Sequence, residues 1–124
     1  FGSVDLLVNN TGINPVYGPM IELDLDAARK IFEVNCLSAL SWTQQVHKAY
    51  MGEHGGSVVN VSSVAGTKPA PGIGFYGASK AMLIHITEEL AVELGHEQVG
   101  VGTRHDVGEV GCGGGRRRRR ELRN

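Results

Sequence analysis

Two short runs of apolar residues, each followed by a long helical pattern, constrain the fold more than any other feature of the sequence. The first run is "VDLLVN" (residues 4–9), which ends in "NNTG", and the second is "SVVNVSS" (57–63). Apolar runs of this length that end in turn residues are typical of strands buried on both faces of a parallel sheet. The sequence therefore predicts that residues 4–9 are a strand buried on both faces, that residues 57–63 are a second strand, and that a third strand lies at Val99 to Val101.

A long helix is predicted between the first two strands. After a loop with two prolines and a glycine, Asp24 or Asp26 is expected to be its N-cap. An apolar stripe at helical spacing follows, and the polar Asn35 lies on the same stripe. The stripe consists of Ala28, Phe32, Ala39, Trp42 and Val46. The glycines of "GEHGG" (52–56) predict the end of this helix.

A second helix is predicted from about Tyr76 to Leu94. Its apolar residues recur at helical spacing: Ala78, Met82, Ile86, Leu90 and Leu94. The order strand, helix, strand, helix, strand indicates an α/β fold with right-handed crossovers and a parallel sheet. Ligands bind beyond the carboxyl ends of the strands in such sheets, so "NNTG" and "SS" are expected to lie at the binding site.

Composition limits the class of protein and the cellular compartment in which this fold is expected. The 124 residues suffice for one globular domain, and they contain neither an apolar run of about 18 residues nor a secretory leader. Cys36 and Cys112 lie far apart without CxxC spacing, which fits a reducing compartment. We therefore predict a cytoplasmic protein. The five histidines never occur at zinc-like spacing, so no metal site is expected.

The C-terminal part of the chain differs from the rest. Residues 1–103 hold five Lys or Arg against ten Asp or Glu, whereas residues 104–124 hold seven against three, including the run Arg116 to Arg120. The same region is rich in glycine. We interpret residues 1–98 as the folded unit and residues 99–124 as a Gly/Arg-rich low-complexity tail, either disordered or produced by a shifted reading frame.

The stretch "FYGASKAM" (75–82) carries a candidate for proton-transfer chemistry. Tyr76 and Lys80 are four residues apart, so on a helix their side chains lie on the same face. Reduction of a ketone by hydride forms an alkoxide that needs a proton. A tyrosine can donate it when a lysine ammonium about 4 Å away makes the phenol a stronger acid. A pair at this spacing is more often part of a solvated helix face, so the pair alone is weak evidence.

Two further polar residues strengthen that candidate. Ser63 ends a strand thirteen residues before Tyr76, where its hydroxyl could donate a hydrogen bond to the same carbonyl oxygen. Asn35 has two interpretations. It either contacts Lys80 through a water molecule, or it is a buried amide that satisfies loose backbone groups.

Together these motifs resemble the short-chain dehydrogenase/reductase family. The matching segments occur in the family's order: "NNTG" (9–12), the helical Asn35, "NVSS" (60–63) and "YGASK" (76–80). The resemblance covers about residues 1 to 98. It implies a partial Rossmann-type doubly wound parallel sheet that runs from the fourth strand to the fifth helix of the family fold, with the first βαβ units missing.

The resemblance also implies a role for each matched residue. Ser63 would polarise the substrate carbonyl and Tyr76 would be the acid/base. Lys80 would bind the nicotinamide ribose and increase the acidity of the phenol, and Asn35 would hold a proton-relay water. Asn9 and Gly12 would lie near the adenosine end of the cofactor and brace the sheet. Thr11 stands where the family usually has alanine.

The implied function is an NAD(P)-dependent oxidoreductase that acts on a small carbonyl or alcohol substrate. General similarity around "FEVNCLSAL" (32–40) and "GSVVNVSS" (56–63) most resembles bacterial 3-oxoacyl-[acyl carrier protein] reductases. NAD and NADP are not distinguished. The family's Gly-rich turn that cradles the pyrophosphate is not found, since "GTKPAPGIG" and "GCGGG" follow the wrong elements or none. The chain alone is therefore expected to be inactive.

Two alternatives to catalysis stay open. In the family, the helices that match residues 26–51 and 76–94 pack against the same helices of a partner and build dimers and tetramers. The full-length enzyme is therefore expected to be a homo-oligomer, and this chain could be a non-catalytic scaffold of the same fold. The run Arg116 to Arg120 could bind nucleic acid. The tail lacks the aromatic residues that usually accompany single-strand binding, which makes this alternative weaker.

Overall fold

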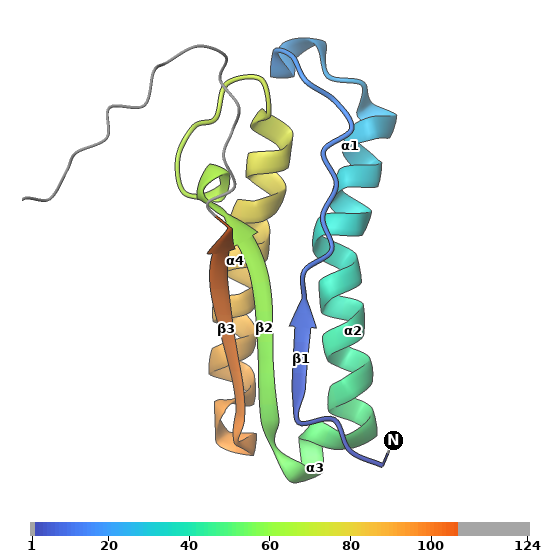
Figure 1. Ribbon diagram of the computed structural model, residues 1–124, viewed down its shortest axis with the longest axis vertical. Coiled ribbons are helices and arrows are strands. Elements are labelled where there is room, and N and C mark those ends of the chain that lie inside the picture. The colour runs from blue at the N-terminus through green and yellow to red at the C-terminus, as the bar shows by residue number, and fades with distance from the viewer. Residues whose placement is uncertain (1, 107–124) are drawn as a thin grey trace, which may run out of the picture.

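The computed structural model describes residues 2–106, which form a three-stranded parallel sheet with helices on one face (Figure 1). The strands are β1 (Leu6–Asn9), β2 (Gly56–Ser63) and β3 (Val99–Asp106), in the order β1-β2-β3. Val8 is paired with Val59 in the register of β1 and β2. The predicted α/β fold with a parallel sheet is confirmed.

The first crossover is one long helical run. It comprises α1 (Leu25–Phe32), α2 (Ser38–Val46) and the single turn α3 (Gly52–His54), joined by two π-helical segments. These segments are η2 (Glu33–Leu37) and η3 (His47–Met51). Asp24 is the N-cap, as expected, and its Oδ1 accepts a hydrogen bond from the main-chain N–H of Asp26 at 3.2 Å. The run ends before Gly55, whose φ of 75° favours glycine.

The π-helical segment η2 changes which side chains of this run face the sheet. Asn35, Ala39 and Thr43 are buried at a spacing of four residues, whereas Trp42 is 56% exposed. A π-helical turn contains more residues than an α-helical turn, so the buried stripe moves by one position along the sequence. The prediction that Trp42 belongs to the core-facing stripe is therefore wrong.

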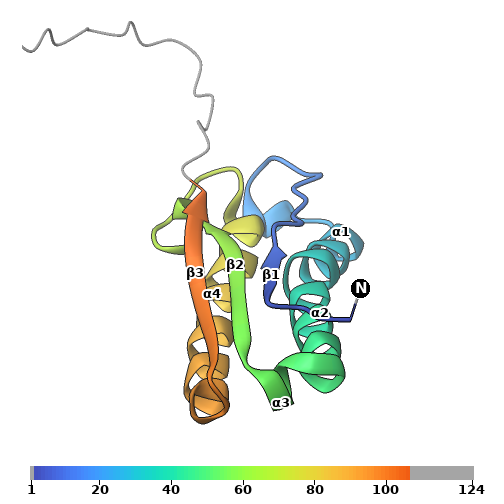
Figure 2. The same ribbon diagram turned by 60° about the horizontal axis from the view of Figure 1, so that its bottom comes forward.

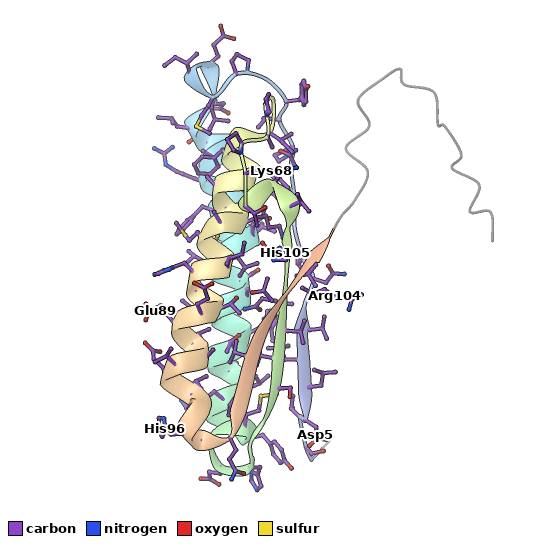
Figure 3. The ribbon with its side chains drawn as sticks, turned by 90° about the vertical axis from the view of Figure 1, so that its left-hand side faces the viewer. Asp5, Lys68, Glu89, His96, Arg104 and His105 are labelled. Carbon is purple, nitrogen blue, oxygen red and sulfur yellow. The ribbon has the colours of Figure 1, made fainter. Side chains whose placement is uncertain are left out.

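The second crossover is α4 (Gly74–Leu94), which lies on the same face of the sheet as the first. Figure 3 views the sheet edge on, with both helical layers on one side and Arg104 pointing away from them. Two right-handed crossovers that proceed in the same direction along a sheet place both helices on one face. On the opposite face, Leu6 is 58% exposed and Val8 is 52% exposed. Within the described residues, the prediction that the first strand is buried on both faces is therefore wrong.

The main apolar core lies between the sheet and the helices, at the end of the sheet opposite the carboxyl ends of the strands. Met51, Val58 and Val99 are its fully buried members. Val4, Leu7, Val46, Leu94 and Val101 pack against them. Complete burial of side chains of this size contributes about 1.5 to 3 kcal/mol each. This core fixes the sheet against the helices at that end.

Only part of the apolar stripe predicted for α4 packs on the core, since Leu94 does so at the end of the helix but Met82 does not. The buried side of this helix carries Ser79, Lys80, Leu83 and Thr87, while Met82 is 44% exposed. At the other end of the chain, β3 continues to Asp106, beyond both the predicted strand end at Val101 and the expected domain boundary at residue 98. Cys112 and the run Arg116 to Arg120 lie outside the described residues. None of the described helices is long and apolar enough to cross a membrane.

Candidate active site

The carboxyl ends of β1 and β2 lie near the start of α4 (Figure 2). Ser63, Tyr76 and Lys80, which are predicted to carry chemistry, belong to these segments, and Asn35 lies in η2. Tyr76 and Lys80 occupy the first two turns of α4. Lys80 is only 4% exposed, and its Nζ donates a hydrogen bond to the main-chain oxygen of Val61 at 3.0 Å. The same nitrogen lies 5.8 Å from the centre of the Tyr76 ring. Burial of an ammonium is unfavourable unless polar contacts compensate it, and the bond to the Val61 oxygen is one such contact.

Asn35 connects this helix to the loop that follows β1. Its Oδ1 accepts a hydrogen bond from the N–H of Ile13 at 2.8 Å, and its Nδ2 donates to the main-chain oxygen of Ile13 at 3.0 Å. Nδ2 also donates to Ser79 Oγ at 3.1 Å. Both amide hydrogens are thereby used. These bonds belong to the second interpretation of Asn35, the backbone-satisfying amide, and its role in a proton relay stays a prediction.

Gly12 brings the same loop against Lys80. A Cβ atom at this position would lie 3.1 Å from Lys80 Nζ and 3.7 Å from Asn35 Oδ1. The loop backbone therefore passes directly beside the ammonium and the amide. The structure thus brings together four of the predicted site residues, namely Gly12, Asn35, Tyr76 and Lys80.

Ser63 is the last residue of β2 and begins the 3₁₀ turn η4 (Val64–Gly66). Its Oγ accepts a hydrogen bond from the N–H of Ala65 at 3.2 Å. The preceding residue, Ser62, is buried, and its hydroxyl donates to the main-chain oxygen of Lys80 at 3.0 Å. The end of β2 is therefore attached to the second turn of α4, next to Tyr76 and Lys80.

Asn9 belongs to a different group of side chains. Its Nδ2 donates to Asn60 Oδ1 at 2.8 Å, and Asn60 Nδ2 donates to Thr87 Oγ1 at 2.9 Å. Nδ2 of Asn9 also reaches Thr43 Oγ1 at 3.4 Å. The network links both helices to the two strands, as a residue that braces the sheet would. Contact between Asn9 and the adenosine end of a cofactor stays a prediction.

Sequence reasoning missed two residues that hold the turn between Tyr76 and Lys80. Ser79 accepts the hydrogen bond from Asn35, and its own Oγ donates to the main-chain oxygen of Tyr76 at 2.6 Å. Cys36 Sγ donates to the main-chain oxygen of Ser79 at 3.1 Å. Burial raises the pKa of the Cys36 thiol, although the charge of Lys80 opposes this shift. The available signal was the position of Ser79 inside "YGASK" and of Cys36 next to Asn35.

Tyr76 lines a cavity of about 250 Å³ in which a small reactant could lie beside its ring. The loops before α1 and before α4 and the first turn of α4 form the other walls, which include Val16, Tyr17, Leu23, Ile73 and Phe75. These walls are mostly apolar, with Asn14, Glu22 and Asp24 as polar members. A mostly apolar cleft with a few polar groups is typical of sites for small molecules.

The fold and the site together define a Rossmann-type α/β protein, with its candidate chemistry at the carboxyl edge of a parallel sheet. The sequence model of the family described as short chain dehydrogenase matches residues 1–105. The chain therefore belongs to the short-chain dehydrogenase family. This match extends beyond residue 98, where the resemblance was expected to end, and it includes most of β3.

Individual relatives agree with this assignment. Dehydrogenase/reductase SDR family member 4 of Caenorhabditis elegans is 37% identical over 101 residues, which cover 82% of this chain and 39% of the relative. The solved structure of ElxO with NADP bound has a TM-score of 0.79 and 30% identity, and covers 83% of this chain and 42% of that chain. Acetoin dehydrogenase from Enterobacter cloacae gives a TM-score of 0.77 at 33% identity, with 83% and 41% covered. The chain spans about two fifths of the length of these relatives.

Proposed function

We propose that this chain carries the catalytic part of an NAD(P)-dependent oxidoreductase that interconverts a carbonyl compound and an alcohol. The observation that carries the proposal is the buried Lys80 ammonium, which is held by the Val61 carbonyl at 5.8 Å from the centre of the Tyr76 ring. The second support is membership of the short-chain dehydrogenase family.

In this proposal Tyr76 donates a proton to the substrate oxygen during reduction and accepts it during oxidation. The ammonium of Lys80 stabilises the phenolate that remains. At the 5.8 Å between Nζ and the ring centre, two unit charges interact by about 3 kcal/mol at an intermediate dielectric constant, which is large enough to matter for proton transfer. The hydroxyl of Ser63 donates a hydrogen bond to the same substrate oxygen, and Asn35 holds the relay water. When bound, the dinucleotide supplies or accepts the hydride.

The residues beside Lys80 suit the ribose of a dinucleotide. Because Gly12 has no side chain, Nζ of Lys80 is not covered by a Cβ that would otherwise lie 3.1 Å away. Lys80 and the hydroxyl of Tyr76 are donors that can bind ribose hydroxyls, and Gly12 and Asn9 lie on the β1 side of the site. Among the neighbours, ElxO was solved with NADP and 4-hydroxyisoleucine dehydrogenase with NADH. The proposal therefore includes either NAD or NADP.

The substrate in this proposal is a small carbonyl or alcohol compound. A 3-oxoacyl thioester is one candidate, which rests only on the sequence resemblance around "FEVNCLSAL" and "GSVVNVSS". The compartment proposed is the cytoplasm. We expect the 124-residue chain by itself to be inactive, because it spans about two fifths of the relatives and its sequence offers no Gly-rich turn in the position that binds the pyrophosphate.

A chimera tests the proposed function. Residues 1–105 replace the matching segment of acetoin dehydrogenase from Enterobacter cloacae, and oxidation of NADH and NADPH is followed with a panel of small ketones. We expect activity that Tyr76→Phe abolishes. Tyr50→Phe, in η3 at the end of the first helical run, should leave the activity intact. A folded chimera that binds the cofactor but reduces no ketone would refute the proposal. Activity of the 124-residue chain alone, abolished by Tyr76→Phe, would refute the expectation that it is inactive.

A second candidate function is self-association through the helical face. Trp42 on α2 and Met82 on α4 are more than two fifths exposed, and Val92 on α4 is 82% exposed. Exposed large apolar side chains on adjacent helices favour a partner of the same chain, as a dimer or tetramer. Light scattering of the chain tests this candidate. Met82→Glu with Val92→Glu should reduce the mass to that of a monomer, whereas Lys68→Glu should not.

A further inference from the structure

We propose that Gly66, Gly77 and Ser62 are positioning residues that set the place of Ser63 relative to Tyr76 and Lys80. This inference rests on the proposed function, because it concerns the geometry of the same three groups. None of the three positioning residues offers a side chain that would touch the substrate. They act instead through a seam between the turn η4 and the first turns of α4, at the carboxyl end of β2.

Gly66 forms one side of this seam. A Cβ at Gly66 would lie 2.8 Å from the carbonyl carbon of Lys80, 2.9 Å from the nitrogen of Ala81 and 3.0 Å from Lys80 Cβ. All three neighbours are main-chain atoms or a Cβ, so they cannot move aside as the end of a flexible side chain would. The main chain of η4 therefore lies directly against the main chain that carries Lys80.

Gly77 forms the other side of the seam. A Cβ at Gly77 would lie 2.5 Å from the main-chain oxygen of Ala65. A glycine of the turn thus faces the helix, and a glycine of the helix faces the turn. Any side chain at either position must push η4 away from α4. Because Gly77 follows Tyr76 directly in the sequence, this displacement acts on the phenol as well.

Ser62 adds a directional bond to the seam. It is buried, and its Oγ donates to the main-chain oxygen of Lys80 at 3.0 Å. Ser63 therefore has an attachment to α4 on each side, through Ser62 before it and through Ala65 and Gly66 after it. Its own Oγ accepts from Ala65, which aligns the hydroxyl with the turn. The position of the Ser63 hydroxyl relative to the first turns of α4 is consequently decided by its neighbours.

The expected consequence of a displaced seam is loss of chemistry more than loss of binding. A misplacement of about 1 Å between reacting groups can lower a rate about 10²-fold. The sequence contains a matched control position. A Cβ at Gly95 would have no neighbour within 4 Å, and this residue has helical dihedral angles.

The test compares Gly66→Ala and Gly77→Ala with the control Gly95→Ala. In the full 124-residue chain labelled with ¹³Cζ-tyrosine, we expect the Tyr76 resonance to shift in the two seam variants and to keep its wild-type position in the control. The resonance of Tyr50, which lies in η3 at the end of the first helical run, should not shift. In the chimera described above, the seam variants should lower kcat about 10²-fold with a smaller change in KM.

The two readouts separate this inference from the proposed function. If the wild-type chimera is inactive, the proposed function fails, and the Tyr76 resonance still decides whether the seam positions the phenol. A Tyr76 resonance and kcat in the seam variants equal to those of Gly95→Ala would overturn the inference. If both seam variants fail to fold, Ser62→Ala replaces them, since it removes one hydroxyl and leaves the packing. An unchanged Tyr76 resonance in Ser62→Ala would then overturn the inference.

Discussion

The side chain of Asn35 forms hydrogen bonds with both main-chain polar groups of Ile13. Ile13 N–H donates to Oδ1 at 2.8 Å, and Nδ2 donates to the Ile13 oxygen at 3.0 Å. The two residues are 22 positions apart, and the loop that contains Ile13 has no regular structure. The buried amide of Asn35, in the π-helical segment η2, therefore satisfies main-chain groups of Ile13 that would be paired with a neighbouring strand in a sheet.

This relationship leads to a prediction about stability. Asn35→Leu retains the approximate volume of the side chain but leaves the N–H and oxygen of Ile13 without their partner. An unpaired group costs about 1 to 3 kcal/mol when it is fully buried and less at the half-buried Ile13, so the free energy of unfolding should fall by about 2 to 4 kcal/mol for the two groups. Urea unfolding of the chain measures this change. Asn10→Leu, at an exposed position, is the control, and equal losses for the two variants would contradict the prediction.

The buried polar network around Asn60 gives a second prediction. Asn60 accepts from Asn9 and donates to Thr87. Thr87→Val keeps the shape of the side chain and removes the acceptor, so we expect a loss of about 1 to 2 kcal/mol. Asn60→Ala removes both bonds and leaves a cavity, so its loss should be larger, about 2 to 4 kcal/mol. Thr67→Val, at an exposed position, should change little, and a comparable effect there would count against the network.

Lys80 gives a prediction in which stability and the proposed activity separate. Lys80→Met keeps the length of the side chain and removes a buried charge, which offsets the loss of the hydrogen bond to Val61. The free energy of unfolding should therefore fall by no more than about 1 kcal/mol. In the chimera the same variant should lose ketone reduction. A loss of stability above about 3 kcal/mol would mean that Lys80 has a structural role.

Glu97 gives a prediction about pH. His47 Nε2 on η3 pairs with Glu97 Oε2, and His96 Nε2 lies 3.8 Å from Glu97 Oε1. The hydrogen bond from His47 lowers the pKa of Glu97, the partial burial of the carboxyl opposes this, and the charges of His47 and His96 add to the lowering. A carboxyl whose pKa is lower in the folded state stabilises the fold above its unfolded pKa, which is about 4.3 for Glu. That stability is lost as the pH falls through the folded value.

Glu97→Gln tests this linkage. At pH 7 the variant should unfold at a lower urea concentration than the wild type, and the difference should shrink below about pH 4 as the carboxyl of the wild type takes up its proton. Glu53→Gln, an exposed residue on α3, serves as the control. A difference between wild type and Glu97→Gln that stays constant down to pH 2.5 would show that the carboxylate charge contributes nothing.

Local pattern and chemistry in the sequence were sufficient for the order of elements. Asp24 could be predicted as an N-cap because capping depends on residues two or three positions away. The first two strands and the end of the first helical run could be predicted because glycines and apolar runs act locally, whereas β3 continues beyond its predicted end. The candidate pair of Tyr76 and Lys80 could be predicted for the same reason, since helical spacing alone places both on one face.

Tertiary structure decided which faces are buried and which groups meet. Trp42 is exposed because the π-helical segment η2 moves the buried stripe toward Thr43, a shift that depends on packing against the sheet. The partners of Asn35 could not be predicted either, because Ile13 and Ser79 are brought to it from two other elements. The sequence by itself therefore determined which chemical groups this protein has and the element that carries each. Only the tertiary structure decided their mutual distances, because contacts such as that of Gly66 with Lys80 join segments that the sequence does not relate.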